Sequence, residues 1–236
     1  MTRLTEKGQG IRDMFDRIAP RYDLLNRLLS LGIDRRWRRF AVGRLRLPEQ
    51  GRVLDIATGT WDVALEVARQ TGSGVTIVGS DFTNGMLVLG QAKIAATRYR
   101  ERILLVNAPC EALPHPQGVF DGVTIAFGIR NVVDREKGLS EMARVLKSGG
   151  RAVILEFSTP TNPLFRGLYH FYFLRVLPWL GGLFSQRSAY QYLPDSVLEF
   201  PDRPTFMGMM KQAGFVDVEL TDLTGGIVSV YVGRKP

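Results

Sequence analysis

Cysteine and histidine are nearly absent from this chain of 236 residues, which holds one cysteine, Cys110, and two histidines. A single cysteine cannot form an internal disulfide, and one cysteine with two histidines cannot assemble a zinc site by themselves. We therefore expect no metal and a protein that works in a reducing cytoplasm.

Long apolar runs are also missing. No window reaches the roughly 20 uninterrupted apolar residues that a spanning helix needs, and the first ten residues, MTRLTEKGQG, lack the apolar core of a signal peptide. If the protein meets a membrane, we expect it to lie on the surface. Hydrophobic residues at 45% and charged residues at 23% are ordinary for one globular domain, which excludes disordered, collagen-like and disulfide-stapled chains.

Negative charge is scarce relative to positive charge. The chain carries 31 Lys+Arg against 23 Asp+Glu, a net charge of +8. Residues 1–50 hold twelve of the basic residues and six acids, so +6 of that excess lies there. Their apolar residues recur at spacings of three and four, which predicts amphipathic helices interrupted at Pro20. A basic segment of this kind favours a nucleic acid or a phospholipid surface, or is a solvated helical face.

From residue 52 onward, strand patterns alternate with helix patterns. The pattern predicts an α/β fold with a parallel sheet covered on both faces, closed by an antiparallel pair near the C-terminus. Strands are expected at 52–57, 75–80, 103–107, 119–127, 152–157, 216–220 and 227–232, and helices at 63–70, 84–99, 136–146 and 205–213. Residues 163–184 are rich in aromatic side chains and poor in charge, which is typical of a buried helix or of an apolar lid over a greasy ligand.

A glycine-containing turn follows the first strand, in the sequence DIATGT at 55–60. Ligands of open α/β sheets bind at the carboxyl ends of the strands, where glycine lets the backbone approach them closely. The turn has only Gly59, so it lacks the G-x-G-x-x-G fingerprint of dinucleotide sites, and the chain has no P-loop. Asp81 directly follows the second strand, where a carboxylate accepts hydrogen bonds from ribose hydroxyls or caps a helix. Turn and acid together indicate a nucleoside cofactor without pyrophosphate, such as S-adenosylmethionine.

Several further motifs resemble the ubiquinone/menaquinone biosynthesis C-methyltransferases over nearly the whole chain. They are FDRIAPRYD at 15–23, LNRLLS at 25–30, DRRWR at 34–38, IAFGIRNV at 125–132, RVLKSGGR at 144–151, LEFS at 155–158, YLPDS at 192–196 and TGGIV at 224–228. The resemblance implies a class I S-adenosylmethionine-dependent methyltransferase, Rossmann-like, with a mostly parallel seven-stranded sheet. One domain is expected, with a helical N-terminal cap at 1–50, a cofactor-binding core at 51–158, an apolar lid or substrate segment at 159–200 and a C-terminal helix with antiparallel strands at 201–236.

The same resemblance assigns roles to matching positions. Its cofactor-binding positions are Gly59, Thr60, Asp81, Pro109, Cys110 and Ala126, and its catalytic positions are Arg130, Asn131 and Tyr22. Arg130 would stabilise a developing phenolate or orient a water, or would form an ion pair with a neighbouring acid; in the catalytic role, Arg130→Ala would cut turnover without unfolding the protein. Trp61 stands where the family usually has glycine, which predicts a large ring beside the methionine end of the cofactor.

The expected activity is methyl transfer from S-adenosylmethionine to a ring carbon of a polyprenyl quinol, most simply demethylmenaquinol. Three alternatives remain for the function. They are methylation of a methoxy-polyprenyl-benzoquinol, methylation of another small molecule or of RNA, and a non-catalytic scaffold. Because the expected substrate is a lipid-soluble quinol, we interpret the N-terminal charge as an attraction to an anionic membrane surface rather than to nucleic acid. We therefore expect a protein that is peripheral on the inner face of the cell membrane. A homodimer is a further expectation.

Overall fold

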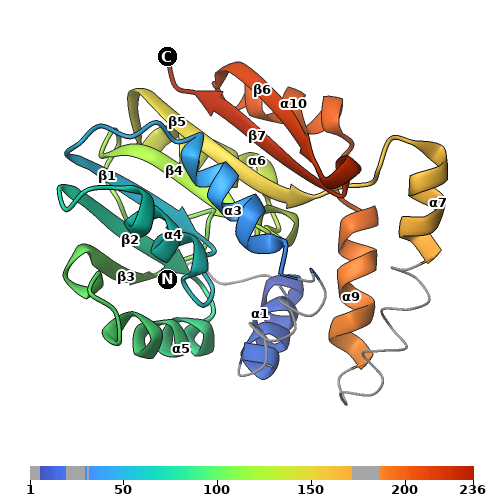
Figure 1. Ribbon diagram of the computed structural model, residues 1–236, viewed down its shortest axis with the longest axis horizontal. Helices are drawn as coiled ribbons and strands as arrows, with labels where there is room; N and C mark the ends of the chain where they lie inside the picture. The colour runs from blue at the N-terminus through green and yellow to red at the C-terminus, as the bar shows by residue number, and fades with distance from the viewer. Residues whose placement is uncertain (1–5, 20–29, 31, 172–186) are drawn as a thin grey trace.

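A seven-stranded sheet forms the centre of the computed structural model, which describes residues 6–19, 30, 32–171 and 187–236 (Figure 1). The strand order is β3-β2-β1-β4-β5-β7-β6. The first five strands pair in parallel, and β7 pairs antiparallel with both β5 and β6. The predicted fold class is confirmed.

The strands lie close to their predicted positions. Their bounds are β1 (Gly51–Ile56), β2 (Val75–Asp81), β3 (Ile103–Asn107), β4 (Phe120–Ala126), β5 (Leu146–Phe157), β6 (Val216–Leu223) and β7 (Val228–Arg234). The main difference is β5, which begins at Leu146, six residues before the predicted start of this strand at 152, and includes Gly149 and Gly150. Leu146 already pairs with Phe120, and the register then shifts before Gly122 pairs with Arg151. Between these pairs, Gly149 donates to the backbone carbonyl of Lys235 and Gly150 accepts from its N–H, directly after β7. Neighbouring backbone therefore extends the strand through residues with little strand propensity of their own.

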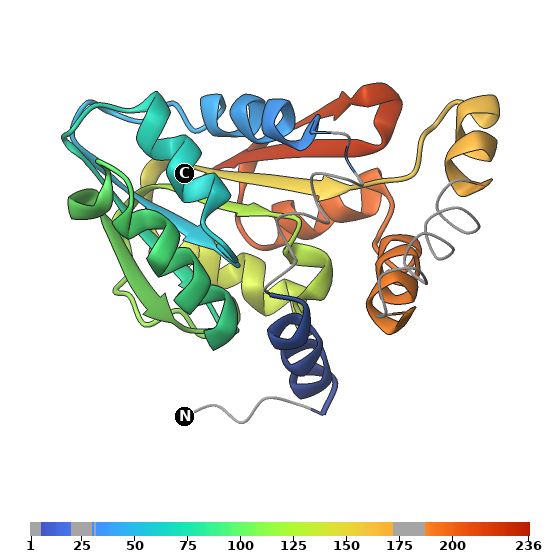
Figure 2. The ribbon, with the colours of Figure 1, turned by 60° about the horizontal axis from the view of Figure 1, so that its bottom comes forward.

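Helices cover both faces of the sheet (Figures 1 and 2). One face packs against α3 (Asp34–Gly43), α4 (Asp62–Gln70) and α5 (Asn84–Ala95), and the other against α6 (Arg135–Val145) and α10 (Arg203–Gln212). Two buried clusters follow, because alternate residues of each strand point to opposite faces. Val53 of β1 belongs to the first cluster, and Leu54 and Ile56 belong to the second.

Three helices lie beyond the end of the sheet that carries the carboxyl ends of the parallel strands: α1 (Glu6–Ile18), α7 (Pro163–Phe171) and α9 (Arg187–Leu198) (Figure 2). The aromatic segment at 163–184 is thus a helix in its first part, and its remainder lies outside the described residues. Within the described part of the chain, no helix combines the length and apolar character needed to cross a membrane.

A side chain of α1 anchors that helix to the core. The Asp16 carboxylate accepts a hydrogen bond from the backbone N–H of Gly85 at 2.8 Å, in the first turn of α5. Such N–H groups have no partner within their own helix, and the positive end of the helix dipole favours a carboxylate there. The N-terminal helix is therefore fixed beside α5 by a cap that comes from a distant part of the sequence.

Candidate active site

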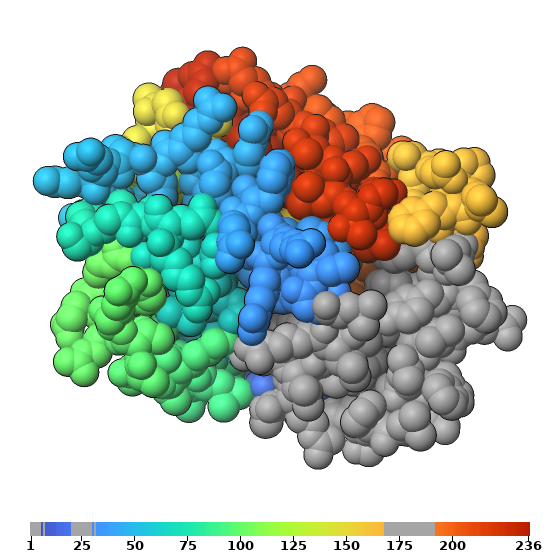
Figure 3. Space-filling model, viewed as in Figure 1, coloured from blue at the N-terminus to red at the C-terminus, as the bar shows by residue number. Residues whose placement is uncertain are grey.

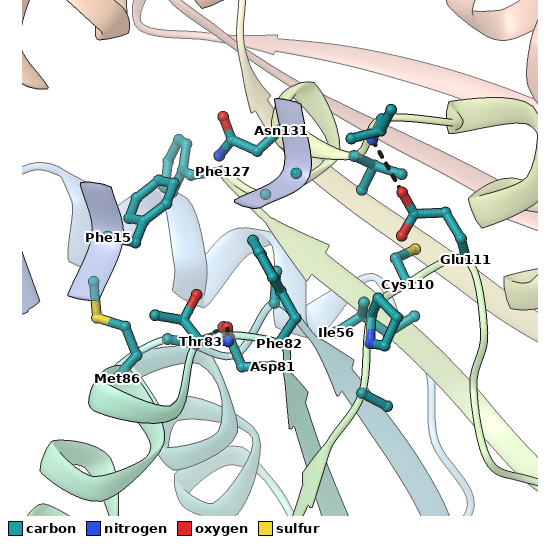
Figure 4. Close-up of a pocket in the computed structure, with 18 of the residues that line it drawn as sticks. Phe15, Ile56, Asp81, Phe82, Thr83, Met86, Cys110, Glu111, Phe127 and Asn131 are labelled. Carbon is teal, nitrogen blue, oxygen red and sulfur yellow. Dashed lines mark hydrogen bonds between the residues drawn. The ribbon is translucent and has the colours of Figure 1, made fainter. Parts of the chain in front are cut away.

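A cavity of about 730 Å³, open to solvent, lies at the carboxyl ends of β1, β2 and β4 (Figure 4). The chain crosses over at this point, because β1 is flanked by β2 on one side and β4 on the other. Such a switch point is where open α/β sheets bind ligands. The wall is mostly apolar and includes Phe15 of α1, Phe82 before α5, Met86 of α5 and Phe127 after β4.

The strand ends are held in unusual backbone conformations. Ala57 and Phe127, which follow β1 and β4, have φ values of 50° and 56°, and Gly59 has a φ of 54°. Positive φ costs energy for residues other than glycine and is concentrated at functional sites. A Cβ on Gly128 would lie 2.6 Å from the Cβ of Ala57, so the two loops approach each other as closely as glycine allows.

Asp81 lies in the cavity wall as expected. One carboxylate oxygen accepts from the backbone N–H of Gly59 at 2.9 Å and the other from that of Thr83 at 2.8 Å. Burial raises the pKa of Asp81, and the two backbone hydrogen bonds oppose that rise. Each oxygen has further lone pairs, so the carboxylate can still accept hydrogen bonds from a ligand's hydroxyl groups.

The wall also contains Gly59, Pro109, Cys110 and Ala126, all predicted as cofactor-binding positions. Burial raises the pKa of the Cys110 thiol, so the side chain is a protonated packing group and not a nucleophile. Thr60, by contrast, is buried and is not part of the cavity wall as formed by the described residues.

Trp61 lies elsewhere than predicted. Its side chain is fully buried, and it is absent from the described wall of the cavity. The ring packs against β2 and α5, where added Cβ atoms on Gly79 and Gly90 would come within 2.6 Å and 1.6 Å of it. The predicted neighbourhood beside the methionine end of the cofactor was wrong, because two distant glycines provide a slot for the ring in the core.

Asp55 precedes the glycine turn and is also buried. Its carboxylate accepts a hydrogen bond from the Thr58 hydroxyl at 2.6 Å. Burial raises the pKa of Asp55 to about 7, and the neighbouring Asp81 adds to the rise, whereas the Thr58 hydrogen bond lowers it. This carboxyl group stabilises the glycine turn through its hydrogen bond with Thr58, and its raised pKa means that it titrates near neutral pH.

The three predicted catalytic residues are placed differently from one another. Asn131 ends the short helix η3 (Ile129–Asn131) and lies in the cavity wall, close to Phe15 and Phe127 (Figure 4). Arg130 is not among the described wall residues, and Tyr22 lies outside the described part of the chain.

The Arg130 guanidinium forms a buried ion pair. Its Nη1 donates to Glu156 Oε1 at 2.9 Å, and its Nε donates to the Ser196 hydroxyl at 3.3 Å. Glu156 has no exposed surface, and its other oxygen accepts from the backbone N–H of Arg130 at 3.2 Å. The geometry matches the alternative in which Arg130 pairs with a neighbouring acid, and the pair fixes η3 against β5 and α9.

Several wall residues were missed by sequence reasoning. Their shared signal is position, since each lies within four residues after a strand end or on α1 or α5: Gly8, Phe15, Phe82, Thr83, Met86, Glu111, Phe127 and Gly128. Phe15 and Phe127 stood inside quoted motifs, so the motif pattern contained them without assigning them a role.

Comparison with known proteins gives a consistent result. The model of the ubiE/COQ5 methyltransferase family matches residues 1–235. A ubiquinone/menaquinone biosynthesis C-methyltransferase of Geobacter sp. is 67% identical, and the match covers 100% of both chains. A demethylmenaquinone methyltransferase of Thermus thermophilus is 49% identical over 94% of this chain and 100% of its own.

Solved structures share the fold at low sequence identity. A possible histamine N-methyltransferase from Thermotoga maritima has a TM-score of 0.64 and 19% identity, covering 95% of this chain and 99% of its own. A putative S-adenosylmethionine-dependent methyltransferase from Methanococcus maripaludis has a TM-score of 0.65 and 18% identity, covering 100% and 97%.

Proposed function

The chain belongs to the ubiE/COQ5 methyltransferase family, and from this membership we propose that it methylates a ring carbon of a polyprenyl quinol, with demethylmenaquinol as the substrate. It is an S-adenosylmethionine-dependent C-methyltransferase. The observation that carries the proposal is that one cavity brings Gly59, Asp81, Cys110 and Asn131 together. The relatives named demethylmenaquinone methyltransferases support the choice of quinol.

The cavity fits S-adenosylmethionine. An added Cβ on Gly59 would meet its nearest atom, the Ala57 carbonyl oxygen, only at 4.0 Å, so the space beside the turn is open. Asp81 offers a carboxylate to the ribose hydroxyls, and Pro109 and Cys110 offer an apolar wall for the adenine. When bound, the cofactor would supply an electrophilic methyl group, carried on a positively charged sulfur that is a good leaving group.

The residues of the chain then act by binding and orienting. The ring carbon becomes nucleophilic when the adjacent quinol hydroxyl gives its proton to water at the open mouth of the cavity, and the ring proton leaves to the same water after the new carbon–carbon bond forms. Asn131 can hold a quinol oxygen from the cavity wall, and Phe15, Phe82 and Phe127 keep water from the reacting atoms. Arg130 contributes by holding η3 and hence Asn131, because its guanidinium is bound to Glu156.

Transfer of labelled methyl from S-adenosylmethionine tests the activity directly. We expect label in demethylmenaquinol, and none in RNA. Greater incorporation into a methoxy-polyprenyl-benzoquinol would support the benzoquinol alternative. Calorimetry with S-adenosylmethionine separates all of these enzymes from a non-catalytic scaffold, which would give no binding.

We also propose that the protein associates with an anionic membrane surface, where its polyprenyl substrate dissolves. Arg35, Arg36 and Phe40 of α3 are exposed, and α3 lies at the surface in the middle of the face in Figure 3. A basic residue near an anionic bilayer adds about 1 kcal/mol of attraction. A homodimer and the lack of a nucleic-acid partner stay predictions.

Sedimentation with anionic vesicles at low and high salt tests this association. The wild type should sediment at low salt and less at high salt, because salt screens surface charges. Replacing Arg35 and Arg36 by Glu should reduce binding. The control replaces Arg98 and Arg100, two exposed arginines just before the start of β3, by Glu and should leave binding unchanged. Absence of binding at low salt would contradict the proposal.

A further inference from the structure

The amide of Asn131 is bound at one end by a residue from a distant helix. The hydroxyl of Tyr192, on α9, donates to Asn131 Oδ1 at 2.9 Å. Both side chains are half-buried, and Asn131 reaches the cavity from η3. The contact joins two segments that are 61 residues apart in the sequence.

The proton of the Tyr192 phenol explains why the oxygen end of the amide faces it. Burial raises the pKa of the Tyr192 phenol, so the group keeps its proton and can donate. The guanidinium groups of Arg130 and Arg135 lower the pKa of this phenol, and the carboxylates of Glu199 and Glu156 raise it. A phenol that donates its proton binds the carbonyl end of the amide, because the NH₂ end has donors only.

The bound carbonyl leaves the other end of the amide for the cavity. In Figure 4 the nitrogen of Asn131 points toward Phe15 and Phe127, and the oxygen points away from them. An amide NH₂ group is a pair of donors with no acceptor capacity. Such a group binds an oxygen that offers lone pairs and favours an ionised oxygen over a neutral hydroxyl, because hydrogen bonds to charged groups are stronger.

The backbone under Asn131 is held as firmly as its side chain. Glu156 accepts from both the backbone N–H and the guanidinium of Arg130, the residue directly before Asn131. The Ser196 hydroxyl, one turn of α9 beyond Tyr192, accepts from the same guanidinium. Two side chains of α9 thus hydrogen-bond to η3: Ser196 binds the guanidinium of Arg130, and Tyr192 binds the amide of Asn131.

We propose that Tyr192 is a positioning residue that fixes the Asn131 amide with its NH₂ group facing the substrate oxygen adjacent to the methylated carbon. The substrate is thereby held as a quinolate, the form in which that carbon is nucleophilic. The inference rests on the proposed function, since it takes the cavity to be the quinol site. Tyr192 acts through Asn131 and does not itself touch the reacting atoms.

The first test is Tyr192→Phe in the full chain, which keeps the ring and removes the donor. Without that hydrogen bond the amide can adopt either orientation, and we expect kcat with demethylmenaquinol to fall about three- to tenfold, the equivalent of one neutral hydrogen bond. The KM for S-adenosylmethionine should not change. Tyr99→Phe is the matched control, because it removes a phenol hydroxyl beside η2 (Arg100–Arg102), which directly precedes β3, and should leave kcat unchanged.

A double-mutant cycle separates positioning from a structural role. If Tyr192 acts through Asn131, the Tyr192→Phe/Asn131→Ala variant should have the same kcat as Asn131→Ala alone. If the fold-losses in kcat of the two single variants multiply in the double variant, Tyr192 contributes independently of Asn131, and the proposal is overturned. A Tyr192→Phe enzyme with wild-type kcat would overturn it as well. A wild-type chain inactive on demethylmenaquinol would overturn the proposed function together with this inference, so the two failures are distinguishable.

Discussion

The slot that holds Trp61 predicts an unusual response to Gly90→Ala. Trp61 precedes α4 with a φ of 72°, and its ring is fully buried between β2 and α5. Alanine normally stabilises a helix interior relative to glycine, by about 0.5–1 kcal/mol. In α5 the same substitution should destabilise the protein, because the added methyl group enters the space of the ring.

The distances determine the size of the effect. The new Cβ would lie 1.6 Å from Trp61 Cδ1 and 2.0 Å from Nε1, whereas ordinary contacts begin at 3.4 Å. The ring cannot retreat, because its far edge already meets Gly79, where a Cβ would be 2.6 Å from Cζ3. Overpacking of this kind costs about 1–3 kcal/mol, occasionally more. After the helix gain we expect a net loss of about 2 kcal/mol, or a Tm lower by about 4–8 °C for a domain of this size.

Urea denaturation and thermal melts of the purified chain provide the assay. The matched control is Gly208→Ala in α10, where an added Cβ meets nothing within 4 Å and stability should rise. In a Trp61→Gly background the slot is empty, so Gly90→Ala should become neutral or stabilising. A Gly90→Ala protein as stable as the wild type, or an equal loss in both backgrounds, would refute the reasoning.

Three shorter predictions concern buried charge. Asp81→Asn should weaken S-adenosylmethionine binding about 10- to 100-fold by calorimetry, since hydrogen bonds to a charged acceptor are lost; unchanged affinity would contradict its role. The pKa of Asp55 is raised to about 7, so its contribution to stability is fully present below pH ~4 and is lost as the pH rises through 7. Asp55→Asn, which keeps an acceptor for Thr58, should therefore gain up to about 4 kcal/mol on the wild type between pH 4 and 8 in urea melts, and a pH-independent difference would argue against this. Arg130→Ala should lower the free energy of unfolding by about 3–5 kcal/mol because Glu156 is left buried and unpaired; an undiminished urea midpoint would exclude that pairing.

The last of these changes an expectation drawn from the sequence. Arg130→Ala was expected to cut turnover without unfolding the protein, but a buried ion pair makes loss of stability the primary effect. Glu156 lies on β5, 26 residues after Arg130. Sequence spacing gives no measure of such a distance, because it depends on how the loop after β4 turns back toward the neighbouring strand.

The parts that could be predicted follow from local rules. Gly59 and Asp81 meet because the strands before them are adjacent and parallel, with Ile56 paired to Ser80, so their carboxyl ends share one edge of the sheet. Buried parallel strands are also continuous apolar runs, which makes them easy to recognise. The position of Trp61 needed non-local information, although a glycine in the middle of α5 was a local signal of close packing.

The basic residues of the N-terminal segment show that a net charge counted from the sequence does not give the charge exposed on the surface. Arg38 is buried and bound to Asp34 and Asp62 at 2.8 Å each, so it adds nothing to an outward field. Phe15, from the same basic region, lines the cavity, while Arg35 on the later helix is exposed. The first 50 residues therefore line the cavity with apolar residues of α1 and present part of their charge outward on α3, so only the exposed arginines can contribute to an outward field.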